Sequence, residues 1–222
     1  ATEKSLMSRD MYAEQVVFQL TGVLKSAQEQ VHKALLGYRD LGSLPENKLA
    51  AVNGLTKLDD EIADAMRTLR KEQSLMFRKS SRAAYRSGVY RGIKEFAAAQ
   101  IPFYRDLTPD GIDKLTTSVF TLIDTDALDF LANYNLVLLG DVSRELESGI
   151  RRTILSGITT GKGVQDIVRD LGEVISDKDS FRSAGSRVFT KAQYRMEMIA
   201  RTEVLRAHNQ GRIKFHREVG VS

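Results

Sequence analysis

The sequence contains no cysteine and no tryptophan among its 222 residues, and only three prolines and three histidines. Without cysteine the chain can form neither a disulfide nor a thiolate metal site, which excludes a disulfide-rich secreted scaffold. Its apolar runs fall short of the roughly 18 residues that a membrane-spanning helix needs, and its first residues lack the apolar core of a signal peptide. We therefore expect neither contact with a membrane nor an export signal.

Metal and cofactor sites have little support in the sequence. His208 and His216 lie two helical turns apart, without the neighbouring acidic residues of a zinc-binding helix. The Gly161-Lys162-Gly163 stretch lacks the Gly-Lys-Ser/Thr ending and the preceding apolar strand of a phosphate-binding loop. We expect no metal and no cofactor, and we expect each histidine, His32 included, at the surface or at a partner contact.

Helical periodicity dominates the first half of the chain. Apolar residues recur every three or four positions over residues 4–39 and again over residues 46–99, with a break at residues 41–45. This pattern predicts a hairpin of two long helices over residues 1–100. Three glycines mark places where the second helix would be interrupted: Gly54, Gly88 and Gly92.

The second half is also predicted to be helical. Thr108 is a suitable N-cap before Pro109, and residues 124–126 predict the start of another helix that reaches Ser156. Gly157 is placed to end that helix in the left-handed conformation. Residues 135–139 also suit a strand, but one isolated strand builds no sheet. The predicted fold is all-α and elongated, with the long N-terminal hairpin followed by a smaller helical bundle over residues 101–222.

The net charge of +4 is distributed unevenly. Residues 67–94 contain nine basic residues and one acidic residue, whereas residues 106–147 contain nine acidic and two basic residues. No pair of these acids has the spacing of a paired-carboxylate hydrolase. The opposite charges suggest packing between the two regions, or contacts between copies of the chain.

Arginines at every fourth position form a basic stripe on one face of the second predicted helix: Arg78, Arg82 and Arg86. Three aromatic residues are interleaved with them: Phe77, Tyr85 and Tyr90. Together with Lys79 and Arg91, the stripe is a candidate contact for a DNA phosphate backbone or an acidic protein surface. A solvated helix face is the plainer alternative. Sequence-specific reading of DNA is not expected, because no groove-reading motif is present.

The most informative segment is the motif segment, residues 199–212, which reads Ile-Ala-Arg-Thr-Glu-Val-Leu-Arg-Ala-His-Asn-Gln-Gly-Arg. As a helix it places Thr202, Arg206 and Asn209 on one face, with Glu203 one turn before Arg206. Threonine, asparagine and glycine are unfavourable inside a helix, so their presence indicates tertiary demands. We interpret the segment as a structural polar network, in which a buried Arg206 would take Glu203 as its partner.

The motif segment resembles the signature of the phage head morphogenesis family, the Mu protein F-like minor capsid proteins, which reads roughly A-R-T-E-x-x-R-A-x-N-x-G. The matching positions are Arg201, Thr202, Glu203, Arg206, Asn209 and Gly211. A weaker match lies upstream, where residues 150–157 are followed by the apolar spacing of residues 164–171. The resemblance covers about residues 145–219. Family members usually continue into a segment with a tryptophan, so a further C-terminal segment is expected that this sequence does not include.

The resemblance implies a minor capsid protein of a tailed phage, made in the host cytoplasm and located in the capsid interior near the portal vertex. Its implied roles are procapsid assembly and DNA packaging or ejection. Its implied partners are the portal protein, packaged double-stranded DNA, the scaffold or major capsid protein, and further copies of the chain. No enzymatic activity is expected.

The alternative is a toxin-like or processing enzyme that carries a head-morphogenesis module, with Glu203 as an active-site acid. The two readings differ in geometry. A catalytic Glu203 should open into a cleft, whereas a structural Glu203 should pack against Arg206 or a neighbouring helix.

Overall fold

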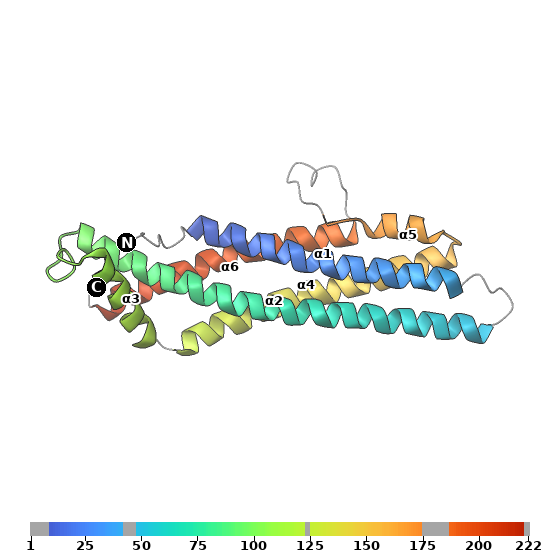
Figure 1. Ribbon diagram of the computed structural model, residues 1–222, viewed down its shortest axis with the longest axis horizontal. Helices are drawn as coiled ribbons and strands as arrows, with labels where there is room; N and C mark the ends of the chain where they lie inside the picture. Colours follow the sequence, from blue (N-terminus) through green and yellow to red (C-terminus); the bar gives the residue numbers. More distant parts are fainter. Residues whose placement is uncertain (1–8, 42–47, 123–124, 175–186, 220–222) are drawn as a thin grey trace. The chain divides into compact units, whose positions relative to one another are not determined.

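The computed structural model describes residues 9–41, 48–122, 125–174 and 187–219. These residues form six helices and no strand (Figure 1). The all-helical class predicted from the sequence is confirmed. No helix in the described part of the chain combines the length and the apolar character needed to cross a bilayer.

The helices follow one another along the chain in the order of their labels. The first of them begins at Arg9, so the predicted start near residue 4 lies outside the described residues, as do residues 42–45 of the predicted break and the predicted start of the second helix at residue 46. The bounds are α1 Arg9–Leu41, α2 Lys48–Ala98, α3 Pro109–Leu122, α4 Thr125–Thr159, α5 Val164–Leu171 and α6 Val188–Glu218.

The start of α3 agrees with the sequence prediction. The hydroxyl oxygen of Thr108 accepts a hydrogen bond from the backbone N–H of Gly111 at 3.2 Å, and Pro109 occupies the first helical position. Thr108 thus satisfies one of the N–H groups that a helix start leaves without an internal partner.

Two predictions about helix breaks were wrong, and the residues that also suited a strand are helical. None of the three glycines proposed as break points interrupts α2, and residues 135–139 belong to α4. Gly157 does not end α4, which continues to Thr159, and the left-handed residue is Gly161, with a φ of 70°. Gly157 instead packs against α5, because a β-carbon at this position would lie 2.5 Å from Cγ1 of Ile167.

The chain divides into two compact units, both of which are built from separate stretches of sequence. Unit 1 comprises Ala1–Val17, Leu75–Leu136 and Ile199–Ser222, and unit 2 comprises Phe18–Ser74 and Val137–Met198. Four helices, α1, α2, α4 and α6, therefore contribute residues to both units. The boundary near residue 100 that the sequence suggested lies inside unit 1.

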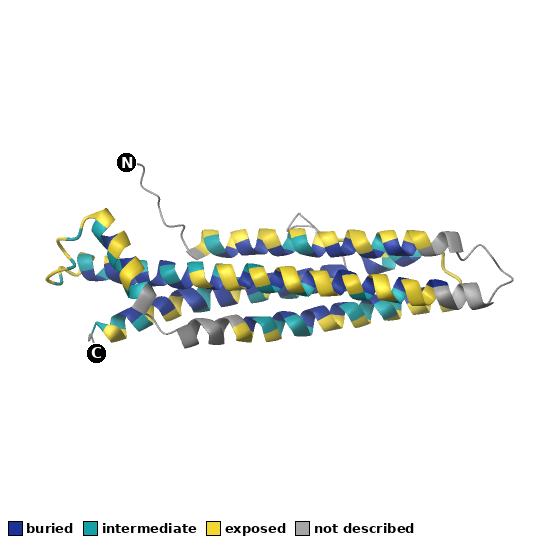
Figure 2. Ribbon diagram, turned by 60° about the horizontal axis from the view of Figure 1, so that its bottom comes forward, coloured by how far each residue is buried: buried dark blue, intermediate teal, exposed yellow. Residues whose placement is uncertain are grey.

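The core of unit 2 is a seam of apolar residues spaced three or four positions apart, which is the pattern of helices packed side by side. Figure 2 shows this pattern as dark-blue patches that recur along one side of the helices. On α1 and α2 the seam includes Leu20, Leu24, Val31, Leu35, Leu58, Ile62, Met66 and Leu69. On α4, α5 and α6 it includes Leu139, Leu146, Ile150, Ile154, Ile167, Leu171, Phe189 and Met196.

A small polar layer interrupts the seam of unit 2. The hydroxyl of Ser143 donates to Oε1 of Gln73 at 3.1 Å, and the amide Nε2 of Gln73 donates to the sulfur of Met196 at 3.2 Å. All three residues are buried. Because a buried polar group must keep its partner, this layer favours one register of α2, α4 and α6 within the unit.

Unit 1 has its own core, formed mainly by α2 and α6. Its largest buried side chains are Phe77, Tyr85, Ile93, Phe96 and Phe215. Asn135 of α4 is buried as well, and its amide donates to the hydroxyl of Ser81 at 3.2 Å. The motif segment, which lies on α6, packs one of its sides against this core.

Candidate functional site

The motif segment buries one side of α6 within unit 1 and exposes the other. Thr202 and Asn209 are exposed, whereas Glu203 and Gly211 are buried. His208 is also buried, so its predicted position at the surface was wrong. The unusual polar residues of the segment thus divide into a solvent-facing group and a core-facing group.

Glu203 and Arg206 form the central ion pair of the segment. Nη1 of Arg206 lies 2.8 Å from Oε1 and 3.0 Å from Oε2 of Glu203. The carboxylate is the buried partner, with 2% of the Glu203 side chain exposed, whereas 40% of the Arg206 side chain is exposed. From the sequence we considered a buried arginine neutralised by Glu203. In the structure the glutamate is the buried group, and the arginine neutralises it.

Tyr134 of α4 completes the surroundings of Arg206. The guanidinium carbon lies 5.0 Å from the centre of the Tyr134 ring, within the range of a cation–π contact. A hydrogen bond with Tyr134 and the charge of Glu203 both raise the pKa of Arg206, so the guanidinium remains charged. Arg206 thereby links α6 to α4 within unit 1.

Burial dominates the electrostatics of Glu203. Removal from water raises the pKa of its carboxyl above the ordinary value of 4.5, and the nearby Arg206 offsets this effect only in part. A raised pKa in a buried acid is also found in catalytic acids. Here, however, both carboxylate oxygens already face the guanidinium of Arg206.

Arg201 and Gly211 connect the segment to two further helices of unit 1. Nε of Arg201 lies 3.4 Å from Oε1 of Glu14 on α1. A β-carbon at Gly211 would lie 2.1 Å from the carbonyl oxygen of Tyr85, so only glycine fits where α6 meets α2. All six matched motif positions thus lie in unit 1. Arg201, Arg206 and Gly211 contact other helices, and Glu203 pairs with Arg206. Thr202 and Asn209 are exposed to solvent.

The basic stripe on α2 is less uniform than the sequence suggested. Arg78 and Arg82 are exposed, and neither forms an ion pair with a described carboxylate. Arg86 instead pairs with Asp113 of α3 at 3.5 Å and donates to the hydroxyl of Thr117 at 2.9 Å. Arg91, the outlying candidate, pairs with Glu95 at 3.1 Å.

Exposed Lys79 joins Arg78 and Arg82 in a group that we call the α2 cation cluster. The aromatic residues predicted to alternate with the stripe do not form a stacking surface, because Phe77 and Tyr85 are buried in the core. Tyr90 lies near the ammonium of Lys94, 5.7 Å from the ring centre. The α2 cation cluster therefore offers charge to a partner and no exposed aromatic platform.

Sequence patterns did not reveal a second polar cluster, which is centred on Glu95. Arg212 of α6 lies 2.7 Å from the Glu95 carboxylate, and Nε2 of His216 lies 3.4 Å from it. The ring of His216 packs against Phe96, with 4.8 Å between ring centres. Since 117 residues separate Glu95 from Arg212, no local spacing could have linked them.

Burial alone would raise the pKa of Glu95, but hydrogen bonds and charges from Arg212 and Arg91 outweigh it and hold the pKa below the ordinary value of 4.5. Glu95 is therefore a stabilising carboxylate of unit 1. Within the described part of the chain, no group of three or more His, Asp or Glu side chains is arranged to hold a metal ion.

The geometry thus describes a motif segment whose buried polar residues serve packing inside unit 1 and whose exposed residues are polar. Comparison of the chain with protein-family models, with curated proteins and with solved structures found no match.

Proposed function

We propose that this chain is a minor capsid protein of the head morphogenesis type, a structural component in the head of a tailed phage. In this role it associates with the portal protein, near the portal vertex inside the capsid, and acts in procapsid assembly and in DNA packaging or ejection. The starting point is the resemblance of the motif segment, residues 199–212, to the family signature.

The observation that carries a structural role is the position of Glu203. Its carboxylate is buried and faces the guanidinium of Arg206, which in turn lies against the ring of Tyr134. An acid that transfers protons to a substrate needs access to that substrate. The packed arrangement supports a structural residue and counts against the alternative of a toxin-like or processing enzyme.

The α2 cation cluster supports a contact with a negatively charged partner. Arg78, Lys79 and Arg82 lie within five consecutive residues of α2, and all three are exposed. Packaged double-stranded DNA and an acidic face of the portal, scaffold or major capsid protein both present such charge. Binding to DNA would be independent of sequence, because charge is the only recognition element that the cluster offers.

The elongated form predicted from the sequence, with a long N-terminal hairpin before a smaller C-terminal bundle, belongs to this proposal. Small-angle X-ray scattering of the chain in solution tests it, because a compact particle of this length has a radius of gyration of only about 17 Å. A measured value at that limit would contradict the elongated form.

The decisive experiment for the proposed function is co-purification with the cognate portal ring, with the stoichiometry measured by native mass spectrometry. We expect a complex with a defined number of copies per ring. Failure to associate while both proteins are folded would remove the portal role. A catalytic turnover that is lost in Glu203→Gln without a change in melting temperature would instead assign Glu203 to chemistry.

The two candidate partners of the α2 cation cluster are separated by one variant, Arg78→Gln/Lys79→Gln/Arg82→Gln. If the cluster contacts DNA, this variant binds duplex DNA more weakly and still associates with the portal. If the cluster contacts protein, the variant loses portal association and keeps its DNA affinity. Lys25→Gln/Lys33→Gln, which neutralises two exposed lysines of α1, is the control for a general effect of charge.

A further inference from the structure

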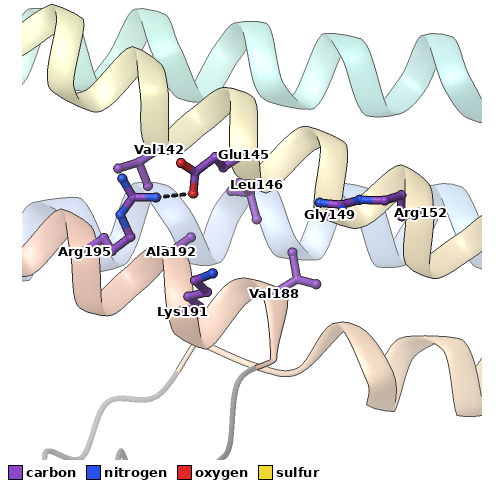
Figure 3. A pocket seen from close by; sticks show the side chains of 9 residues that line it. All are labelled: Val142, Glu145, Leu146, Gly149, Arg152, Val188, Lys191, Ala192 and Arg195. Atoms are coloured by element: carbon purple, nitrogen blue, oxygen red, sulfur yellow. Dashed lines mark hydrogen bonds and ion pairs between the residues drawn. The ribbon is translucent and has the colours of Figure 1, made fainter.

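A groove of about 260 Å³ lies between α4 and α6 in unit 2 (Figure 3). Its floor contains Val142, Leu146 and Ala192, all of which are buried. Gly149 also lines the groove, and a β-carbon there would lie 2.8 Å from Cγ1 of Val188, so the two helices already approach closely at that point. Gly149 and Ala192 have small side chains, so they leave the space above them unfilled. The groove therefore results from the packing of α4 and α6.

The rim of the groove is charged and predominantly positive. Three cationic residues and one carboxylate line it: Arg152, Lys191, Arg195 and Glu145. Arg195 forms an ion pair with Glu145, drawn as a dashed line in Figure 3. The only carboxylate among the described lining residues is therefore already neutralised.

The other two cations are not neutralised by described residues. Nε of Arg152 donates to the backbone carbonyl of Ser148 at 3.4 Å, a long hydrogen bond that leaves the charge uncompensated. Lys191 is exposed and forms no ion pair with a described carboxylate. These two positive charges come from different helices and line the same hollow, with the side chain of Lys191 directed into it in Figure 3.

An anion placed between two such groups interacts favourably with both. A guanidinium offers a planar fork of donors and an ammonium offers a compact charge, and both are used by proteins to bind phosphate oxygens. We propose that this groove binds a phosphate group, held between Arg152 and Lys191. This inference does not depend on the proposed virion role.

The size and lining of the groove limit the kind of ligand to which the phosphate group can belong. Sites for drug-sized ligands and cofactors enclose roughly 300–1,000 Å³, which is more than this groove provides. Among the described residues, its lining contains no aromatic ring on which a nucleobase could stack. The ligand class is therefore inorganic phosphate or a small phosphate monoester.

The test is a titration of the full chain with inorganic phosphate, followed by ³¹P NMR or calorimetry at low and constant ionic strength. Arg152→Gln/Lys191→Gln should weaken binding at least about tenfold, because it removes both charge-assisted contacts. The matched control Lys33→Gln/Arg67→Gln removes the same charges from exposed positions of α1 and α2 in the same unit and should bind like the unmodified chain. Equal loss of affinity in the two double variants would overturn the site.

A third variant predicts a change in the opposite direction. Glu145→Gln releases Arg195 from its ion pair and removes the one negative charge of the described rim residues, so phosphate should bind more tightly. Unchanged or weaker binding in Glu145→Gln would contradict the assignment. So would displacement of phosphate by chloride at the same ionic strength, because screening is then unchanged and the displacement indicates non-selective binding of anions.

Duplex DNA provides the last arm of the test. If the groove accepts a small phosphate, then Arg152→Gln/Lys191→Gln should lose phosphate binding without a change in DNA affinity. If the double variant loses affinity for DNA while inorganic phosphate never binds, then these residues form a polyanion surface and the small-ligand site is refuted.

Discussion

Gly211 of α6 packs directly against the carbonyl oxygen of Tyr85 on α2, where a β-carbon would lie 2.1 Å away. The contact is matched one turn along, because a β-carbon at Gly88 would lie 1.9 Å from the carbonyl oxygen of His208. The two helices of unit 1 therefore touch backbone to backbone. This close approach explains why glycine is present at both positions, although it costs about 1 kcal/mol relative to alanine inside a helix.

Gly211→Ala should destabilise unit 1 by roughly 3 kcal/mol, because the backbone of α2 has to move away from the new methyl group. The matched control is Gly140→Ala on α4, where a β-carbon meets nothing within 4 Å. That change should leave stability unaltered or raise it by up to about 1 kcal/mol through helix propensity. Urea unfolding followed by circular dichroism measures both, and effects of the same sign would contradict the close contact.

Arg206→Met should be more harmful at neutral pH than Glu203→Gln. The first variant leaves a buried carboxylate without its cation, at a cost of about 3–5 kcal/mol. The second leaves a partly exposed guanidinium facing an amide oxygen, at a cost below about 1 kcal/mol. Glu203→Ala should fall between them, because it also removes packing atoms. The free energies of unfolding of the three variants provide the measurement, and the reverse order would show that the arginine is the buried partner.

The Glu203–Arg206 pair also predicts how the stability of the folded chain depends on pH. Because the folded-state pKa of Glu203 is raised, the unfolded chain releases this proton near 4.5 while the folded chain still holds it. The contribution of Glu203 to stability therefore falls as pH rises from 4.5 through the folded pKa. We expect Glu203→Gln to gain stability relative to the unmodified chain across that window. If the difference in free energy of unfolding between Glu203→Gln and the unmodified chain stays constant with pH, the pKa of Glu203 is not raised.

Glu95 should show the opposite dependence. Its folded-state pKa lies below 4.5, so its ion pairs stabilise unit 1 above 4.5, and this contribution is lost as pH falls from 4.5 through the folded pKa. Glu95→Gln should be less stable than the unmodified chain at neutral pH and should lose less stability on acidification. Stability measured from neutral pH down to about pH 3 tests this. Arg212→Gln is the companion variant, which should move the acid transition to higher pH.

DNA binding through the α2 cation cluster should depend steeply on salt. Each phosphate neutralised on duplex DNA contributes roughly 0.9 to the slope of log K against log salt. Arg78→Gln/Lys79→Gln/Arg82→Gln should therefore make that slope shallower by up to about three units, with the helix intact because glutamine is a comparable helix former. Arg86→Gln should change it less, since Arg86 already pairs with Asp113. A slope that is the same in the triple variant would exclude the cluster as the DNA contact.

Local signals in the sequence predicted much of the helical structure. The three- and four-residue spacing of apolar side chains located α1 and α2, and Thr108 with Pro109 marked the start of α3. These signals depend on residues within a few turns of one another. They could not predict that the compact units would combine distant stretches of the chain, because the apolar seam repeats in the same way through both.

The wrong predictions share a physical cause, which is that tertiary packing decided between local alternatives. Gly157 suits a left-handed helix end, but the close approach of Ile167 keeps it inside α4. Tyr85 directly precedes Arg86 in sequence, yet one residue turns the helix by about 100°, and its ring is buried while Arg86 reaches Asp113. Of the candidate site, the Glu203–Arg206 spacing was readable from sequence, and the depth of the carboxylate was not.

The sulfur of Met196, described above as an acceptor for Gln73, has a consequence for oxidative chemistry. Met196 is 1% exposed, whereas Met198, two residues further along α6, is 50% exposed. Peroxide reacts with accessible thioethers and converts them to polar sulfoxides. Mild oxidation should therefore modify Met198 and spare Met196 for as long as unit 2 stays packed. Sulfoxide at Met196 would report opening of the polar layer, because that sulfur is buried for as long as Gln73 stays bonded to it.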